Sequence, residues 1–223
     1  MKKNLLLMGI FKIIFGLLLM SALLFLPAGS LYYYGAWRLL ALLFIPMPVV
    51  GLVLYFKAPD LLRKRLNSKE QEPEQKKVIM LSSLIFIIGF VLAGLDFRFR
   101  WTQLPLPVVI IGSLLFLAAY GLYVEVMHEN AYLSRTVEVQ KNQMVIDTGL
   151  YGVVRHPMYA AVTILFLSMP LVLGSAIAII PFIFVPAVLV KRIRNEEKVL
   201  EEGLPGYREY KAKVKYRLLP FIW

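Results

Sequence analysis

Long apolar segments constrain this chain more than any other feature of its sequence. A helix needs about 20 mostly apolar residues to cross a bilayer, and the chain contains several such runs separated by short charged stretches. The first run extends from Leu5 to Leu26 and carries one charge, at Lys12. Hydrophobic residues make up 59% of the chain, whereas an average soluble domain is about 45–50% apolar. These features predict a polytopic membrane protein and exclude a cytosolic enzyme, a disordered chain and a disulfide scaffold.

Five further segments are expected to cross the membrane. They are predicted at residues 37–56, 78–95, 106–126, 159–173 and 175–190. The last two are separated only by Gly174 and together are too long for one crossing, which favours a tight helical hairpin over a single kinked helix. The first segment follows Lys2 and Lys3 as a signal peptide would, but its apolar run is longer than a signal core. We therefore expect a retained first helix and an all-α polytopic membrane protein with about six transmembrane helices.

The distribution of basic residues predicts the orientation of these helices. Cytoplasmic loops of membrane proteins collect Lys and Arg. All but four of the 25 basic residues fall on one side of the predicted spans; Arg38, Arg98 and Arg100 fall on the other, and Lys12 lies within the first span. Both termini are therefore expected in the cytoplasm. Topology and contact with anionic lipid account for the formal net charge of +11, so nucleic-acid binding is not expected.

The polar sequence outside the spans is short and divides the chain into two parts. Residues 57–77 form a charged linker without aromatic residues, to which we assign no chemistry. The chain has no cysteine and two histidines, so a metal site is not expected. Walker, GxGxxG, HExxH and GxSxG motifs are absent from the sequence. We expect an N-terminal membrane region of four helices at 1–127 and a C-terminal module at 128–223 with a small cytoplasmic cofactor-binding region.

The first polar segment of the C-terminal module lies between the fourth and fifth predicted spans. Alternating polar and apolar residues at 137–147 favour a short β-hairpin. A glycine-rich turn follows at 148–152, and Pro157 suits the first turn of the next helix because its missing N–H costs nothing there. Arg155 and His156 therefore lie at the cytoplasmic end of the fifth helix, where free backbone N–H groups and the helix dipole favour an anionic ligand.

The second polar segment continues the sixth helix into the cytoplasm. Because the preceding hairpin is tight, Glu196 and Glu197 are expected to emerge beside the segment that carries Arg155, His156 and Tyr159. Each feature also has a simpler explanation, since an Arg-His pair can anchor a lipid headgroup and adjacent glutamates are usually a solvated helix face. A functional site is favoured because both clusters flank the same hairpin on the same side of the membrane.

Together these segments resemble a known family of membrane enzymes. Residues 148–159, Thr-Gly-Leu-Tyr-Gly-Val-Val-Arg-His-Pro-Met-Tyr, are similar to the G-x-Y…R-H-P-x-Y signature of the isoprenylcysteine carboxyl methyltransferase family. Residues 192–220 resemble its E-E-x-x-L…Y-x-x-Y…P tail. The resemblance covers about residues 130–223. The same module also resembles phospholipid N-methyltransferases and, more distantly, integral-membrane sterol reductases.

The resemblance implies a membrane-embedded methyltransferase that uses S-adenosylmethionine as its cofactor. It implies a cofactor cavity built from the two polar segments, with these cofactor-binding residues: Tyr151, Arg155, His156, Tyr159, Glu196 and Glu197. Asn130 and Arg135 match family positions just before the R-H-P-x-Y segment and are expected at the reaction centre, where Arg135 would orient an anionic acceptor. The alternative for Arg135 is that it only binds a phosphate headgroup.

The family also implies the kind of acceptor. Methyl transfer from a sulfonium mainly requires alignment of donor and acceptor, and a carboxylate acceptor needs no general base, whereas an amine must first be neutral. We expect a lipophilic acceptor that enters from the bilayer and is methylated on a carboxylate. The alternatives are a phospholipid or other small-acceptor N- or S-methyltransferase, a membrane reductase that uses NADPH, and a non-enzymatic transporter or scaffold. The double glutamate matches the methyltransferase pattern better than the reductase, and a transporter would place its polar groups at mid-membrane.

Overall fold

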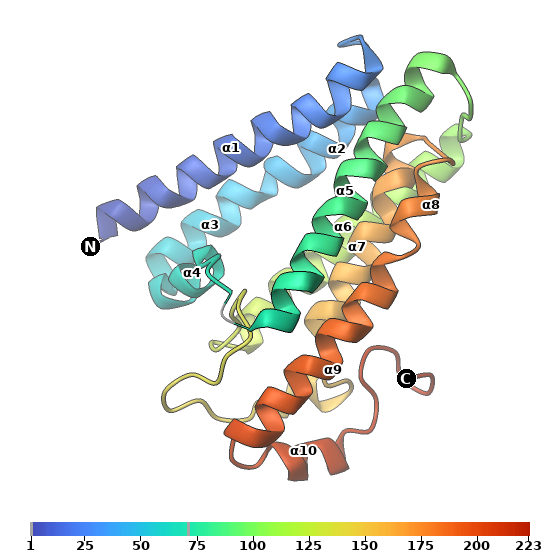
Figure 1. Ribbon diagram of the computed structural model, residues 1–223. Helices are drawn as coiled ribbons and strands as arrows, with labels where there is room; N and C mark the ends of the chain where they lie inside the picture. Colours follow the sequence, from blue (N-terminus) through green and yellow to red (C-terminus); the bar gives the residue numbers. More distant parts are fainter. Residues whose placement is uncertain (1, 71) are drawn as a thin grey trace.

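The computed structural model describes residues 2–70 and 72–223, and within them the fold is helical without any β-strand (Figure 1). The helices are α1 (Lys2–Ala28), α2 (Tyr34–Phe44), α3 (Pro46–Lys57), α4 (Pro59–Leu66), α5 (Pro73–Phe99), α6 (Leu106–Glu129), the 3₁₀ helix η1 (Gly149–Gly152), α7 (Pro157–Leu173), α8 (Ile179–Phe182), α9 (Val185–Gly203) and α10 (Tyr207–Lys213). The predicted all-α class is confirmed.

Four helical segments of the described residues are long and apolar enough to cross a membrane. They are α1, the pair α2 and α3, α5, and α6, and each coincides with a predicted span. The second span is divided at Ile45, because Pro46 has no N–H to donate and begins a new helix. Large apolar side chains such as Phe11, Leu18 and Phe56 are exposed on the outer faces of these helices. Such surfaces are suited to contact with lipid tails.

The predicted helical hairpin is present, although its second limb is divided. Helix α7 ends at Leu173, and Gly174 takes a φ of 77°, a conformation that glycine adopts without strain. The chain then reverses, and α8 and α9 return along α7 (Figure 1). Helix α7 is shorter than the four candidate spans, so the count of six crossings stays a prediction. We call the region around Gly174 the turn end of this hairpin, and the region where α7 begins and α9 leaves its open end.

The core holds the hairpin among the longer helices. Helix α6 packs along α7, α1 packs along α5, and α5 packs along α9. Fully buried side chains fill the contacts between them: Leu24, Leu39, Phe116, Phe182 and Ile193. As a result, both limbs of the hairpin lie inside the bundle, and the polar residues at their ends have fixed positions.

The expected β-hairpin at 137–147 was wrong, because these residues form an irregular loop. The loop does contain a turn, in which the Gln143 N–H donates to the Gln140 carbonyl at 3.1 Å and the Gln140 N–H donates to Gln143 Oε1 at 2.9 Å. Side chains, not a partner strand, satisfy the backbone there. The alternating pattern arises because Val139 and Val145 pack on the junction of α9 and α10.

The interpretation of 57–77 as a solvated linker was also wrong. Pro59 begins the short helix α4, whose Leu61 and Leu62 are buried. Glu70 is buried as well, and its carboxylate accepts the backbone N–H of Val137 at 3.3 Å. Charge dominates the composition of this segment, but a single apolar face is enough to dock it against the bundle.

Candidate functional site

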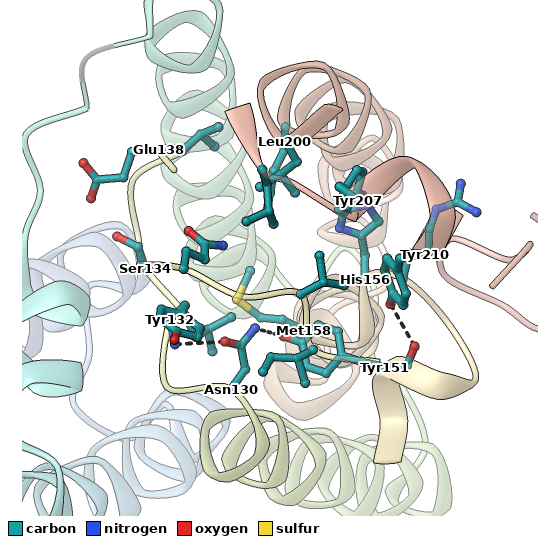
Figure 2. A pocket seen from close by; sticks show the side chains of 18 of the residues that line it. Asn130, Tyr132, Ser134, Glu138, Tyr151, His156, Met158, Leu200, Tyr207 and Tyr210 are labelled. Atoms are coloured by element: carbon teal, nitrogen blue, oxygen red, sulfur yellow. Dashed lines mark hydrogen bonds between the residues drawn. The ribbon is translucent and has the colours of Figure 1, made fainter. Parts of the chain in front are cut away.

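A pocket at the open end of the α7–α9 hairpin gathers most of the predicted site residues (Figure 2). Its cavity volume is about 100 Å³, and its mouth is open to solvent. The loop after α6, the first turn of α7, α9 and α10 form its walls. The predicted residues that line it are Asn130, Tyr151, Arg155, His156, Tyr159 and Glu196. Glu197 and Arg135 do not line it.

Glu197 is buried, with 3% of the residue exposed, and lies at the centre of an ion-pair network. Its Oε1 accepts a hydrogen bond from Arg155 Nε at 2.8 Å and lies 3.3 Å from His156 Nε2. Its Oε2 accepts a hydrogen bond from Arg217 Nε at 2.9 Å. Burial acts to raise the pKa of Glu197, but the hydrogen bonds from His156 and Arg155 outweigh burial and lower the pKa to about 2. Both carboxylate oxygens are therefore used within the protein.

Arg155 joins the start of α7 to the C-terminal segment. Its Nη1 donates to the carbonyl oxygens of Val214 and Lys215 at 2.6 and 2.8 Å. The backbone N–H groups of Arg155 and His156 donate to the next two carbonyl oxygens of that segment, both at 2.9 Å. The N–H groups of Arg155 and His156 are therefore not free to bind an anion, and an anionic ligand at the first turn of α7 stays a prediction.

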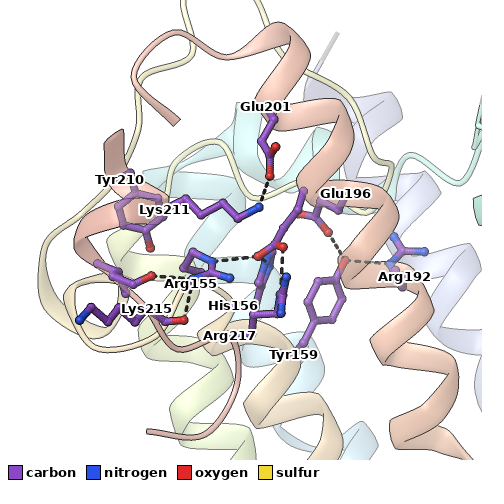
Figure 3. Close-up of polar contacts among 12 residues, drawn as sticks. Arg155, His156, Tyr159, Arg192, Glu196, Glu201, Tyr210, Lys211, Lys215 and Arg217 are labelled. Atoms are coloured by element: carbon purple, nitrogen blue, oxygen red, sulfur yellow. Dashed lines mark hydrogen bonds and ion pairs between the residues drawn. The ribbon is translucent and has the colours of Figure 1, made fainter. Parts of the chain in front are cut away.

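Glu196 faces the pocket and belongs to a second network. Its carboxylate accepts a hydrogen bond from the Tyr159 hydroxyl, which in turn accepts one from Arg192 Nε at 2.8 Å (Figure 3). Arg192 also donates through Nη2 to the carbonyl oxygen of Arg135 at 2.7 Å. Consecutive residues on an α-helix point about 100° apart, which separates the environments of the two glutamates. Glu197 is enclosed by cations, and Glu196 lines the pocket wall.

Buried tyrosines form much of the rest of the pocket. The Tyr151 hydroxyl accepts a hydrogen bond from Asn130 Nδ2 at 2.9 Å, and the Tyr210 hydroxyl donates to the Tyr151 carbonyl at 2.8 Å (Figure 2). Burial raises the pKa of Tyr151 and of Tyr210, so both hydroxyls stay neutral at physiological pH.

Tyr207 lines the pocket and has a buried side-chain atom without a hydrogen-bond partner among the described residues. Its side chain is buried, with 4% of the residue exposed, and its hydroxyl has no hydrogen-bond partner in the described part of the chain. A buried polar atom without a partner costs about 1–3 kcal/mol. A ligand that forms a hydrogen bond with this hydroxyl would recover that energy.

The glycine-rich turn positions Tyr151. Both carboxylate oxygens of Glu129 accept the Leu150 N–H, at 3.1 and 3.0 Å. Gly149 has a φ of 53°, and a Cβ atom at this position would lie 1.9 Å from Glu129 Oε1. The positive φ favours glycine, and a larger residue would have to displace the Glu129 carboxylate, which explains the glycine in the turn that leads into α7.

The sequence analysis did not assign Arg192, Tyr207 or Tyr210 to the site. Two spacings could have found them, since residues three or four apart share one face of a helix. Arg192 precedes Glu196 by four residues, and Tyr207 precedes Tyr210 by three. The family's Y-x-x-Y pattern therefore marks a pair of residues that line the pocket.

Arg135 lies at a different cavity. Its side chain is exposed, and Nη1 lies 3.5 Å from the Ser68 hydroxyl, at a groove between α1, α3 and α4. Ser134 and Thr136 line the pocket on either side of it. Asn130 and Arg135, predicted together at the reaction centre, thus line two separate cavities.

The fold and the pocket define an all-helical membrane protein with a pocket at one end of a helical hairpin. Residues 108–202 match the model of the isoprenylcysteine carboxyl methyltransferase (ICMT) family, and this part of the chain belongs to that family. The matched segment contains α7 and most of α9, including both glutamates. Tyr207, Tyr210 and Arg217 follow the matched segment. No cluster of three or more potential metal ligands occurs among the described residues.

The chain is also similar to a sterol reductase. It is 29% identical to the delta(14)-sterol reductase of Mus musculus over 92 residues, which are 40% of this chain and 22% of the reductase. The chain therefore spans about a fifth of the length of this curated relative.

Proposed function

We propose that this chain is an integral-membrane methyltransferase that transfers a methyl group from S-adenosylmethionine to a lipophilic acceptor. The pocket at the open end of the hairpin carries this proposal. It falls largely within the segment that matches the methyltransferase family, and it combines the Glu196 carboxylate with buried tyrosines and the unpartnered hydroxyl of Tyr207. The alternative that a specific finding favours is an NADPH-dependent reductase, because of the similarity to the sterol reductase.

The residues of the pocket fit the groups of S-adenosylmethionine. Glu196 can accept hydrogen bonds from the ammonium or the ribose hydroxyls, and Tyr207 offers a hydroxyl with no competing partner. Arg155 and Arg192 supply positive charge at the wall, which suits the cofactor carboxylate. The aromatic faces of the tyrosines can pack on adenine or attract the sulfonium through a cation–π interaction.

The side chains of this pocket bind and orient the reactants and exclude water. Bound S-adenosylmethionine supplies an activated methyl group on a sulfonium. Tyr151 and Tyr210 have raised pKa values, so they act as neutral hydrogen-bonding groups and not as bases. Glu197 has a lowered pKa of about 2, so it is charged at neutral pH and holds Arg155 and His156 in place. If the acceptor is a carboxylate, as the family suggests, no residue has to remove a proton.

We further propose that the pocket faces the cytoplasm, with both termini on that side. The positive-inside distribution of Lys and Arg supports this orientation. The open end of the hairpin is the end rich in basic residues.

Thermal unfolding of the detergent-solubilised protein tests the cofactor. A ligand at 100 times its dissociation constant stabilises a folded protein by about 2.7 kcal/mol. We expect S-adenosylmethionine and S-adenosylhomocysteine to raise the unfolding temperature, and NADPH to leave it unchanged. Stabilisation by NADPH alone would overturn the proposal in favour of a reductase.

A further inference from the structure

The groove between α1, α3 and α4 is a second cavity, separate from the pocket at the open end of the hairpin (Figure 1). Its cavity volume is about 470 Å³, and most of its lining residues are apolar. Leu5 and Leu62 are buried in it, whereas Ile10 and Leu52 are 43% and 49% exposed. Because α1 and α3 belong to candidate membrane spans, the exposed side of the groove is open to lipid. The groove therefore offers an acyl chain an apolar surface.

Three cations converge on this groove: Lys12, Arg65 and Arg135. Lys12 is the charged residue of the candidate span Asn4–Ala28, and a charge inside a membrane span is costly and commonly functional. Its Nζ donates to the Leu66 carbonyl and to the Ser68 hydroxyl, and the same hydroxyl lies 3.5 Å from Arg135 Nη1. Cations from α1, from α4 and from the loop after α6 thus lie at one end of an apolar groove.

The positive charge of the groove has no counter-charge from its own lining. In the described part of the chain, no acidic side chain lines the groove, and none of the three cations takes part in an ion pair. Burial and the like charges of Arg135 and Arg192 lower the pKa of Arg65 to about 10, so its guanidinium is still charged at neutral pH. Like charges held this close favour an anionic ligand between them.

We propose that this groove binds one anionic phospholipid of the surrounding bilayer, with its phosphate at Lys12, Arg65 and Arg135 and an acyl chain between α1 and α3. The lipid is a bound effector and not a reactant. Charge complementarity selects this occupant, because a phosphatidylcholine would bring a quaternary ammonium to three cations. A phosphate also accepts hydrogen bonds from several cations at once, and basic pockets beside membrane helices bind anionic headgroups in this way.

The cations of the groove also touch the wall of the other pocket. Arg65 Nη1 donates to the Ser134 carbonyl at 3.1 Å and lies 3.8 Å from Met158 Sδ, and both residues line that pocket. Arg135 lies between Ser134 and Thr136, which also line it. A phosphate that holds Arg65 and Arg135 together therefore fixes this part of the pocket wall. We expect the bound lipid to strengthen cofactor binding, a consequence that rests on the proposed function.

Native mass spectrometry of the delipidated protein in detergent tests the groove. The probe is dioleoylphosphatidylglycerol, and dioleoylphosphatidylcholine, with the same chains and no net charge, is its matched control. We expect the first phosphatidylglycerol to bind about tenfold more tightly than the first phosphatidylcholine. Arg135→Gln should reduce this preference about fivefold, since a basic residue contributes about 1 kcal/mol to binding an anionic headgroup. Lys141→Gln removes the same charge from the same loop outside the groove and should leave the preference unchanged. Equal binding of the two lipids, or equal effects of the two variants, would overturn the proposal.

A glycine substitution tests the position of the acyl chain. A Cβ at Gly51, which lines the groove, would meet no atom within 4 Å, so Gly51→Leu should fold and fill the groove. Gly121 on α6 has the same open surroundings outside the groove, and Gly121→Leu is the control. We expect Gly51→Leu to weaken phosphatidylglycerol binding about tenfold and Gly121→Leu to leave it unchanged. If the two variants bind this lipid equally well, the site is not this groove.

Calorimetry with S-adenosylhomocysteine, in nanodiscs made from each of the two lipids, tests the link to the pocket. We expect the wild type to bind it about fivefold more tightly in phosphatidylglycerol, and Arg135→Gln to bind it equally in both lipids. Equal binding by the wild type in both lipids would overturn the role of the lipid as an effector. Loss of S-adenosylhomocysteine binding in both lipids, with the lipid preference of the groove intact, would remove the proposed function and retain the phospholipid site.

Discussion

At the turn end of the α7–α9 hairpin, buried polar groups are matched with one another, whereas at its open end several are not. Asp96 is 1% exposed, and its carboxylate accepts hydrogen bonds from the Thr102 N–H at 2.6 Å and from the Thr102 and Ser175 hydroxyls. Tyr33 and Arg38 donate to backbone carbonyl oxygens at the end of α7, at 3.1 and 3.0 Å. These polar groups at the turn end are therefore hydrogen-bonded within the protein.

The open end contains the ion-pair network of Glu197, but not all of its buried polar atoms have partners among the described residues. The buried side-chain atoms without a partner in the described part of the chain are Gln75 Oε1, Gln140 Oε1, Asn195 Nδ2 and Tyr207 Oη, and all of them lie near this end. Native proteins leave few buried polar atoms unsatisfied, and of these four residues Tyr207 lines the pocket, which supports the binding site proposed there. The comparison teaches that a cluster of buried polar groups is not by itself a sign of a binding site in this fold. A buried polar atom that has no hydrogen-bond partner and lies at a pocket is the more informative feature.

Removing Glu197 should produce the largest loss of stability at the open end. Glu197→Ala leaves the buried guanidinium of Arg155 without its partner, and breaking a buried ion pair in this way costs about 3–5 kcal/mol. Glu201→Ala is the control, because its pair with Lys211 is partly exposed and contributes about 0–1 kcal/mol. Chemical unfolding in detergent measures both. Equal losses would show that the Glu197 network does not hold the open end together.

Lowering the pH should weaken the same ion pairs of Glu197. The pKa of Glu197 is lowered from 4.5 to about 2, so the folded state binds its proton less readily than the unfolded state. Its stabilisation is complete above the unfolded pKa and is lost as the pH falls from about 4.5 to about 2. The difference in unfolding free energy between wild type and Glu197→Gln should therefore shrink across this range. A constant difference would contradict a charged Glu197.

At the turn end, Asp96→Asn should destabilise the fold without changing ligand binding. An amide presents only one acceptor oxygen where the carboxylate presents two, so at least one donor from Thr102 or Ser175 loses its acceptor. The expected cost is about 1–3 kcal/mol. Calorimetry with S-adenosylhomocysteine should give the wild-type affinity. A large fall in affinity would contradict the conclusion that Asp96 at the turn end has no influence on ligand binding at the open end.

The neighbouring glutamate at the open end should behave in the opposite way. Glu196→Gln retains the size of the side chain and removes the charge that faces the pocket. We expect S-adenosylmethionine to bind about tenfold more weakly, with little change in unfolding temperature. Unchanged affinity would mean that Glu196 serves only to hold Tyr159.

The smallest expected effect is at Tyr207. Tyr207→Phe removes the unpartnered hydroxyl, so the ligand-free protein should be as stable as the wild type or slightly more stable. Ligand binding should weaken by about 0.5–1.5 kcal/mol, the contribution of one ordinary hydrogen bond. Thermal unfolding with and without S-adenosylhomocysteine measures both changes. A loss of stability without ligand would indicate that the hydroxyl already has a structural role.

The sequence by itself determined the helical membrane class, the hairpin at Gly174 and the family of the C-terminal module. These properties are local, because a span depends on the length of one apolar run and the turn depends on one glycine. The order of Arg155, His156, Tyr159 and Glu196 along the chain was likewise enough to bring four of the pocket residues together, once the hairpin was assumed.

Only the tertiary structure decided which polar residues are free to meet a ligand. Glu196 and Glu197 are adjacent in sequence, yet they point in different directions from α9. The C-terminal segment packs over Glu197 and encloses it, whereas Glu196 lines the pocket. Arg135 was expected beside Asn130 but lies at the groove, because α4 packs under the loop that carries it. The direction of a side chain depends on contacts between segments far apart in the chain, and no local pattern contains that information.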